Sequence, residues 1–199
     1  NQYPIHSESK KGFHEHKEGA CLSALMQNKR FGFVSGGLDD RGAFSELFEA
    51  DQDQYSPGLT AILADTLSRA ELFEALYHRH CYATTGDRII LNYTLAQKKM
   101  GSELSTADKP GLETIRHISG YVAGTSPIET IEIIRNGQVK RHFEPKCDHF
   151  DFEWDDLDSL ESVCLKDPKS NALFSFYYIR VKLKNGHMAW GSPIWIDTV

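Results

Sequence analysis

The sequence predicts an α+β protein in two parts, with strand–helix units over residues 1–88 and an antiparallel β-sandwich over residues 89–199. Three observations support this prediction. A segment with helical apolar spacing lies between two short apolar runs in the first part. After Arg88, apolar and polar residues alternate at the period of a strand. Two Asn-Gly pairs, at 136–137 and 185–186, then supply the strongest short-range hairpin signal.

The clearest predicted helix covers residues 68–80. Ser68 and Glu71 form a capping box, in which the Ser side chain bonds an unpaired amide at the helix start and the Glu reaches back. Residues 78–80, His-Arg-His, occupy the last turn, where positive charge suits the helix dipole. One apolar stripe at helical spacing is expected to face the core, and it consists of Leu72, Phe73, Leu76 and Tyr77.

Shorter apolar segments predict the other elements of the first part. Residues 20–29 are expected to form a short helix, and residues 31–34 a buried strand. Short apolar runs at 59–63 and 89–91 predict strands on either side of the long helix. The whole stretch from 58 to 88 is therefore expected to be a strand–helix–strand scaffold.

The second part is predicted to consist of about seven strands. Their expected ranges are 89–95, 115–122, 128–134, 139–143, 150–154, 173–183 and 188–196. This number of strands with two tight turns is typical of an immunoglobulin-like or fibronectin-like sandwich. Trp154, Trp190 and Trp195 are expected to pack in the interior, because large aromatic residues supply much of the buried area of a small sandwich.

The composition excludes several classes of function. The net charge of −6 argues against a nucleic-acid partner, because phosphate binding requires a basic surface. No apolar run approaches the roughly 20 residues that a membrane helix needs. No targeting segment is visible, so the localisation is not predicted. The four cysteines contain no C-x-x-C pair, and they are expected to be buried free thiols, with two disulfides as the alternative: Cys21, Cys81, Cys147 and Cys164.

Several segments carry a resemblance to a known family. G-L-T-A at 58–61, E-L-F-E-A-L at 71–76 and C-Y-A-T-T-G-D-R-I at 81–89 occur in an order that resembles the domain-of-unknown-function 3604 family. The ending at 177–195 resembles the end of the same family. That family resembles PHP-type (polymerase and histidinol phosphatase) metallohydrolases and is similar to carbaryl-hydrolase-like proteins. The resemblance implies that residues 1–88 are the terminal strand–helix units of a PHP-like α/β barrel, and that the chain is the C-terminal part of something longer.

The resemblance also implies a divalent-metal site in intact relatives. The family's strand V-E-I-H-S corresponds to Tyr-Pro-Ile-His-Ser here, with Pro4 at the position of the Glu that belongs to the metal site. The family's D-x-H corresponds to Leu-Asp-Asp, with Leu38 at the Asp and Asp40 at the His. Neither Pro nor Leu can ligate a metal, whereas a carboxylate can bind a hard cation. His6 and Asp40 are therefore the candidate metal ligands of this chain, and no catalytic residue is assigned.

Two hypotheses for the function follow. The first is that the chain is the C-terminal part of a PHP-like metal-dependent hydrolase, acting on a small-molecule phosphoester or related ester through metal-activated water. The degenerate site implies that the chain alone is inactive and holds no metal cofactor. The alternative is a non-catalytic binding or structural module. Its partner would be the missing N-terminal part or a second copy in a homo-oligomer; nucleic acid and membrane are not expected as partners.

Overall fold

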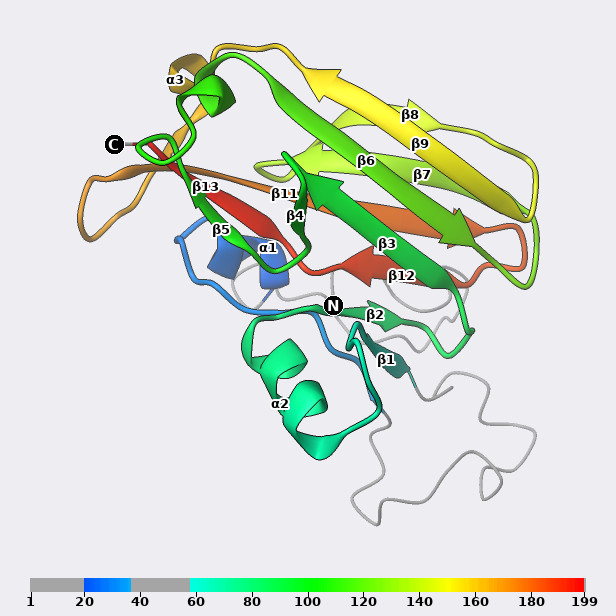
Figure 1. Cartoon of the computed structure of the whole chain (residues 1–199). Helices are drawn as coiled ribbons and strands as arrows, with labels where there is room; N and C mark the ends of the chain where they lie inside the picture. The colour runs from blue at the N-terminus through cyan, green and yellow to red at the C-terminus, as the bar shows by residue number, and fades with distance from the viewer. Residues whose placement is uncertain (1–19, 37–57, 199) are drawn as a thin grey trace.

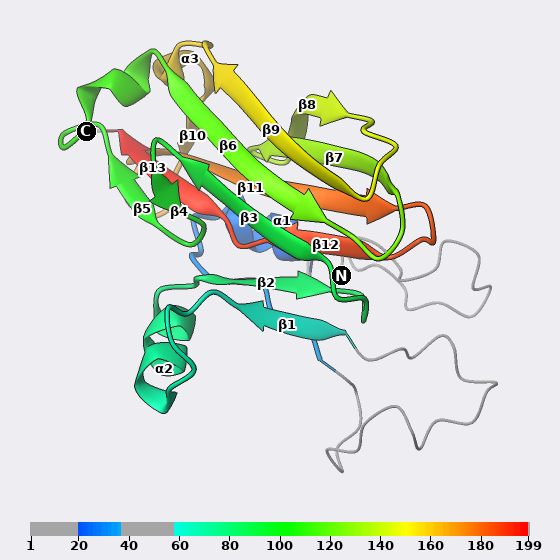
Figure 2. The ribbon, with the colours of Figure 1, turned by 45° about the vertical axis from the view of Figure 1, so that its right-hand side comes forward.

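The computed structural model describes residues 20–36 and 58–198, and in these residues β-sheet dominates (Figure 1). Two sheets face one another, and a short helical segment covers the outer face of the larger sheet (Figure 2). In the described part of the chain, no helix combines the length and the apolar character needed to cross a membrane.

The larger sheet is built around the long strand β11 (Leu173–Leu183). One side of β11 pairs with β7 (Ile128–Arg135) and, near its start, with β10 (Leu165–Lys166). Its other side pairs with β13 (Ile194–Thr198) and then β12 (Met188–Gly191). The sheet is completed by β8 (Gln138–Phe143) beside β7, β5 (Glu103–Ser105) parallel to β13, β2 (Cys81–Thr84) beside β12 and β1 (Leu59–Ile62) at the edge.

The smaller sheet is fully antiparallel. Its order is β4 (Lys98–Lys99), β3 (Ile90–Leu95), β6 (Arg116–Ala123) and β9 (His149–Asp156). The register places Leu91 opposite Val122 and Gly120 opposite Phe152. A Cβ on Gly120 would lie 2.3 Å from the Phe152 ring, so glycine lets this aromatic ring lie against the strand.

Helices are short and lie outside the sheets. They are α1 (Cys21–Leu25), α2 (Arg69–Tyr77), the 3-10 helix η4 (Pro110–Glu113) and α3 (Leu160–Val163). The predicted cap of α2 is confirmed, because the Ser68 hydroxyl accepts a hydrogen bond from the Glu71 amide at 3.2 Å. The helix ends in a Schellman motif: Arg79 is left-handed (φ 61°), and the His80 amide donates to the Ala75 carbonyl at 2.8 Å.

The main core lies between the two sheets. Side chains from alternate positions of facing strands interdigitate there, which is how a two-layer β structure removes apolar surface from water. The smaller sheet contributes Leu91, Tyr93, Leu95, Ile118, Val122 and Phe152; the larger sheet contributes Ile131, Ile133, Ile179, Val181, Leu183, Ala189, Ile194 and Ile196.

A second apolar cluster covers the opposite face of the larger sheet. Leu25 of α1 is buried there against Phe176 and Trp195. The segment after α1 continues this cover, since the Phe33 ring packs edge-on against Tyr178 with centroids 5.6 Å apart. Residues 31–34 thus form an irregular extended segment, and the prediction of a regular strand there is wrong.

The prediction of terminal strand–helix units of an α/β barrel is also wrong for the described residues. A barrel requires the strands on either side of a helix to run parallel. Here β1 and β2 flank α2 but pair antiparallel, with Leu59 opposite Thr84 and Ile62 opposite Cys81. In both ribbon views α2 lies at the end of this pair (Figures 1 and 2). The two strands extend the edge of the larger sheet through β12, and the described residues contain no barrel.

Several other predictions are confirmed. The predicted helix over 68–80 appears as the shorter α2, which ends at Tyr77. Both Asn-Gly pairs form hairpin turns, between β7 and β8 and between β11 and β12. The closing strand predicted over 188–196 is interrupted at Pro193, which has no amide to donate to a ladder, and continues as β13. No strand was predicted for the segments that form β2, β4, β5 and β10.

Candidate functional site

The predicted metal ligands, His6 and Asp40, lie outside the described residues, as do Pro4 and Leu38. Ser35 and Thr60, which flank the segment that contains Asp40, are hydrogen-bonded to each other. The Ser35 amide donates to the Thr60 hydroxyl at 2.9 Å, and this hydroxyl donates to the Ser35 carbonyl at 2.7 Å. Within residues 20–36 and 58–198, no three His, Cys, Asp or Glu side chains gather in a way that would hold a metal ion.

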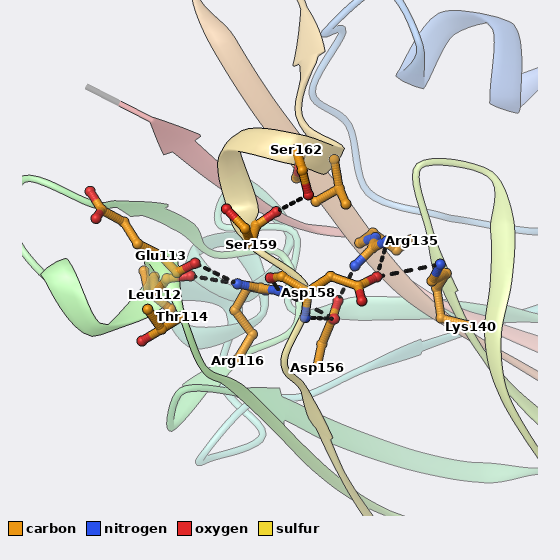
Figure 3. Close-up of polar contacts among 12 residues, drawn as sticks. Leu112, Glu113, Thr114, Arg116, Arg135, Lys140, Asp156, Asp158, Ser159 and Ser162 are labelled. Atoms are coloured by element: carbon orange, nitrogen blue, oxygen red, sulfur yellow. Dashed lines mark hydrogen bonds and ion pairs between the residues drawn. The ribbon is translucent and has the colours of Figure 1, made fainter.

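A buried ion network joins the two sheets at one end of the core (Figure 3). Asp156 of β9 accepts hydrogen bonds from Arg135 of β7 at 2.6 Å and from the Tyr177 hydroxyl of β11 at 2.8 Å. Its other oxygen lies 3.2 Å from Nη2 of Arg116, on β6. Because two of these residues come from each sheet, the network ties the sheets together.

Arg116 uses its whole guanidinium within the protein. It is fully buried, its Nε donates to the Tyr177 hydroxyl at 2.9 Å, and its Nη1 donates to the Leu112 carbonyl at 2.8 Å. Its Nη2 also donates to the Asp158 carbonyl. A buried charge is tolerated only when its donors are satisfied in this way, which identifies Arg116 as part of a structural clamp.

The environment of the network fixes its protonation states. Burial opposes the charge of Arg135, but hydrogen bonds to Asp158 and Asp156 outweigh it and raise the Arg135 pKa. The same Arg135 holds the pKa of the Asp158 carboxyl below its usual value. Burial raises the pKa of the Tyr177 phenol, which therefore stays protonated as a donor to Asp156. Arg135 and Asp158 therefore stay charged around neutral pH, and the ion pair between them persists there.

The strand pattern of the sequence contains a signal for this network, although no ion pair was predicted from it. Arg116 falls in the inward register of β6 with Ile118 and Val122. Asp156 falls in the inward register of β9 with Phe152. Two opposite charges at inward positions of different strands indicate a buried ion pair, because an unpaired charge there would be strongly destabilising.

A pocket of about 330 Å³ lies where the end of α2 meets the β4–β5 connection. Its lining consists of residues 78–80 after α2, Lys98 of β4 and residues 101–103. Residues 78–80 were predicted to lie in the last turn of the helix, but α2 ends at Tyr77 and they follow it. The proximity of 78–80 to 98–103 is tertiary, so no local pattern predicts the pocket.

The pocket contains one acid and several cationic groups. The acid, Glu103, is paired on both sides, with Arg79 and Arg30 each at 2.5 Å. Arg30 also bonds Asp197, so it links Glu103 to the end of β13. Burial and neighbouring positive charges lower the pKa of the His80 imidazole, which indicates an electropositive environment.

The apolar stripe predicted for α2 is mostly exposed. Phe73 is 65% exposed, Leu76 43% and Tyr77 69%, while Ala75 is the buried residue of this helix. The rings of Phe73 and Tyr77 stack on one another with centroids 6.2 Å apart. Leu67, just before the helix, is 94% exposed. The prediction that this stripe faces the core is therefore wrong, and an apolar surface remains without a cover among the described residues.

The cysteines are free, as predicted, but only Cys81 is buried. Its thiol lies 3.6 Å from the Ser192 hydroxyl, which donates to the Cys81 carbonyl and accepts from the Phe33 amide. Burial raises the pKa of the Cys81 thiol, the opposite of what a nucleophilic cysteine requires. The Ser192 hydroxyl, which bonds both the Phe33 amide and the Cys81 carbonyl, therefore anchors the segment after α1 to the sheet.

The pocket and the exposed helix face both lie in a stretch with a recognisable family signature. A family model described as Protein of unknown function (DUF3604) matches residues 16–109. The DUF3604 match includes Asp40, α2 and the complete lining of the pocket, while His6 and the ion network lie outside it. No solved structure matches the chain.

Longer chlamydial proteins are similar to nearly the whole chain. An uncharacterized protein of Chlamydia trachomatis is 58% identical over 183 residues, and one of Chlamydia muridarum is 59% identical over the same length. An uncharacterized protein of Chlamydia pneumoniae is 52% identical over 197 residues. These matches cover 92–99% of this chain but only 30–31% of each relative. The chain therefore spans about a third of the length of the curated relatives it matches.

Proposed function

We propose that this chain is a non-catalytic docking module of a longer DUF3604-type protein, in which the exposed face of α2 packs against the rest of the polypeptide. The observation that carries the proposal is the exposed stripe of Phe73, Leu76 and Tyr77, together with Leu67. Exposed apolar groups that cluster on one element mark interaction surfaces. The chlamydial relatives supply the occupant, since about 70% of their length lies outside the match.

The arrangement of α2 favours docking. The helix is fixed at both ends, by the Ser68 cap and by the left-handed Arg79, whose guanidinium bonds the Gly101 carbonyl at 3.0 Å. A helix anchored by polar contacts retains its conformation while its apolar face stays available. Preorganisation of this kind reduces the entropy lost on association.

A double substitution tests the docking face. In a full-length chimaera, this chain replaces the matched third of the Chlamydia trachomatis relative. Phe73→Ser with Tyr77→Ser should destabilise the chimaera by about 2–4 kcal/mol more than the isolated chain, because only the chimaera would bury both rings. Leu157→Ser is the matched control, since Leu157 is 68% exposed and distant from α2 in sequence. Equal effects of the double substitution in both proteins would contradict the proposal.

The second candidate concerns the longer protein. We infer that it is a PHP-like metal-dependent hydrolase of phosphoesters or related esters, and that this chain carries a degenerate part of its metal site. The DUF3604 match over Asp40 supports this candidate, together with the resemblance of the segments around His6 and Leu38 to the family's ligand strands. Metal-assisted hydrolysis requires several fixed ligands and an open position for water. Pro4 and Leu38 remove two of those ligands.

Metal analysis and an esterase assay test this candidate. The 199-residue chain should retain no stoichiometric zinc, manganese or iron after dialysis, and should show no phosphoesterase or carboxylesterase activity. Leu38→Asp combined with Asp40→His restores the family's D-x-H and should increase manganese or zinc binding in the longer protein. Chelator-sensitive turnover by the unmodified chain would show that a complete site is present.

A further inference from the structure

We propose that the pocket between the end of α2 and the β4–β5 connection binds a phosphate group, held by Lys98, the Ser102 hydroxyl and the imidazoles of His78 and His80. The phosphate is either free or part of a small monoester, because both present the same oxygens. This inference goes beyond the proposed function, since it concerns a different surface from the apolar face of α2.

The wall of the pocket is built from close backbone packing. Gly101 has a φ of +87°, and a Cβ there would lie 2.4 Å from the Arg79 carbonyl oxygen. The β4–β5 connection therefore packs directly on the turn after α2. Arg79 itself has a left-handed backbone, a conformation that disfavours residues with a side chain.

The charges of the wall favour an anion. Glu103 is neutralised by Arg30 and Arg79. Lys98 forms no ion pair with any residue in the described ranges, so its ammonium is available to a ligand. Lys99 lies beside it and has one exposed partner, Asp65, at 3.6 Å.

The available donors suit a tetrahedral oxyanion. The Arg79 guanidinium already bonds the Gly101 carbonyl and the Glu103 carboxylate, so its planar fork is occupied. The remaining donors are single groups on three segments: the Lys98 ammonium, the Ser102 hydroxyl and the imidazole N–H groups. Donors that converge from several directions match the oxygens of a phosphate, whereas a planar carboxylate prefers a paired fork.

The pocket lies at the C-terminus of α2, and this location is compatible with phosphate binding. Helix C-termini carry partial negative charge on unpaired carbonyls. In α2 the carbonyls of Ala75 and Leu76 accept hydrogen bonds from the amides of His80 and Arg79, at 2.8 and 3.0 Å. Their partial charge is thereby compensated by the Schellman motif.

The histidines make the binding pH-dependent. Four titratable groups surround His80. His78 and Arg79 follow α2, Lys99 belongs to β4, and Asp65 lies in the loop before α2. His78 has one exposed acidic neighbour, Glu74, at 3.5 Å. Both imidazoles bind an anion better when they are protonated. Affinity should therefore rise as the pH falls, and a bound anion should raise the pKa of His80.

The test is a titration of the 199-residue chain with sodium sulfate, followed by NMR of the His78 and His80 imidazoles. Sulfate has the shape of phosphate and keeps its charge between about pH 5 and 8, the range in which histidine side chains in general change charge. We expect saturable shifts of both imidazoles, a raised His80 pKa and tighter binding at lower pH. A parallel titration uses glycerol phosphate, a phosphate monoester. If glycerol phosphate binds more tightly than sulfate, the pocket is a monoester site; if the two bind equally, it is a site for the free anion.

Matched variants locate the site. Lys98→Gln should weaken sulfate binding about tenfold, the loss expected for one charge-assisted contact, whereas Lys98→Arg should retain it. Lys184→Gln, an exposed lysine outside the pocket, is the control. Unchanged thermal unfolding verifies that each variant is folded. The proposal fails if sulfate does not shift the imidazoles, if Lys184→Gln weakens binding as much as Lys98→Gln, or if acetate binds as tightly as sulfate.

Discussion

At the scale of residues, the stability of this protein depends on a few buried polar groups as well as on its apolar core. Arg116 and Asp156 occupy inward positions among Ile, Val and Phe side chains. Strand alternation predicts which positions face inward, but it does not predict which charges meet across two sheets. Which charges meet depends on how the sheet that contains β6 and β9 packs on the sheet that contains β7 and β11.

Removing the charge at the centre of the network should be costly. Asp156→Asn leaves Arg116 and part of Arg135 as uncompensated buried charges, and we expect a loss of about 3–5 kcal/mol in the free energy of unfolding. Asp155→Asn is the matched control, because the side chain of the adjacent Asp155 is exposed and, among residues 20–36 and 58–198, pairs with His117 at the surface. Its effect should stay within about 0.5 kcal/mol in urea unfolding. Similar values for the two variants would contradict the clamp.

The pKa of His80 gives a pH dependence of defined sign. Its folded pKa is lowered, first by burial and then by neighbouring positive charges, so the unfolded chain binds a proton more readily. The stability contributed by the neutral imidazole is complete above the unfolded pKa, about 6.5. It is lost as the pH falls through the folded pKa. In sulfate-free buffer, His80→Gln should flatten the decrease in unfolding free energy between about pH 7 and 5; an unchanged slope would show that His80 does not contribute.

At the scale of elements, local signals predicted α2 and the hairpin turns well. The Ser68 half of the predicted capping box forms, whereas the Ser68 amide donates to the Thr66 carbonyl at 3.0 Å instead of to the Glu71 side chain. Asn136 and Gly137 both adopt positive φ in the turn between β7 and β8. These features depend on near neighbours in the chain. The apolar stripe of α2 was predicted to be buried, because period alone identifies an apolar face but not whether another element covers it.

Two leucine substitutions distinguish a buried helix from an exposed one. Leu25 of α1 is 1% exposed, so Leu25→Ala should cost about 2–5 kcal/mol in chemical unfolding of the isolated chain. Leu76 of α2 is 43% exposed, and Leu76→Ala should cost less than about 1 kcal/mol. If Leu76 were in the core, as the sequence predicted, Leu76→Ala would also cost about 2–5 kcal/mol. A loss at Leu76 equal to that at Leu25 would show that α2 is covered in the isolated chain.

At the scale of the whole molecule, the sequence predicted most strands of residues 89–199 but placed the first part in the wrong architecture. A strand–helix–strand order is compatible with both parallel and antiparallel strands. The resemblance to PHP-type proteins favoured the parallel, barrel-like choice. In the molecule, β1 and β2 pair antiparallel and join β12, because the short helix α2 stays at the end of the pair and does not cross a sheet face.

The candidate sites were the least predictable part of the molecule. His6 and Asp40 were identified by resemblance, and they lie outside the described residues. The pocket requires Lys98 and Ser102 to meet the end of α2, which only the fold determines. The docking face is visible only once burial is known, since a buried and an exposed helix face have the same apolar spacing.

Hydrogen exchange in α2 tests the docking function most directly. The amides of residues 69–77 are compared by mass spectrometry in the isolated 199-residue chain and in the full-length chimaera with the Chlamydia trachomatis relative. Docking predicts at least about tenfold slower exchange of these amides in the chimaera, with unchanged exchange in β11, because burial of the stripe suppresses local opening of the helix. Equal exchange rates of α2 in the two proteins would contradict the account.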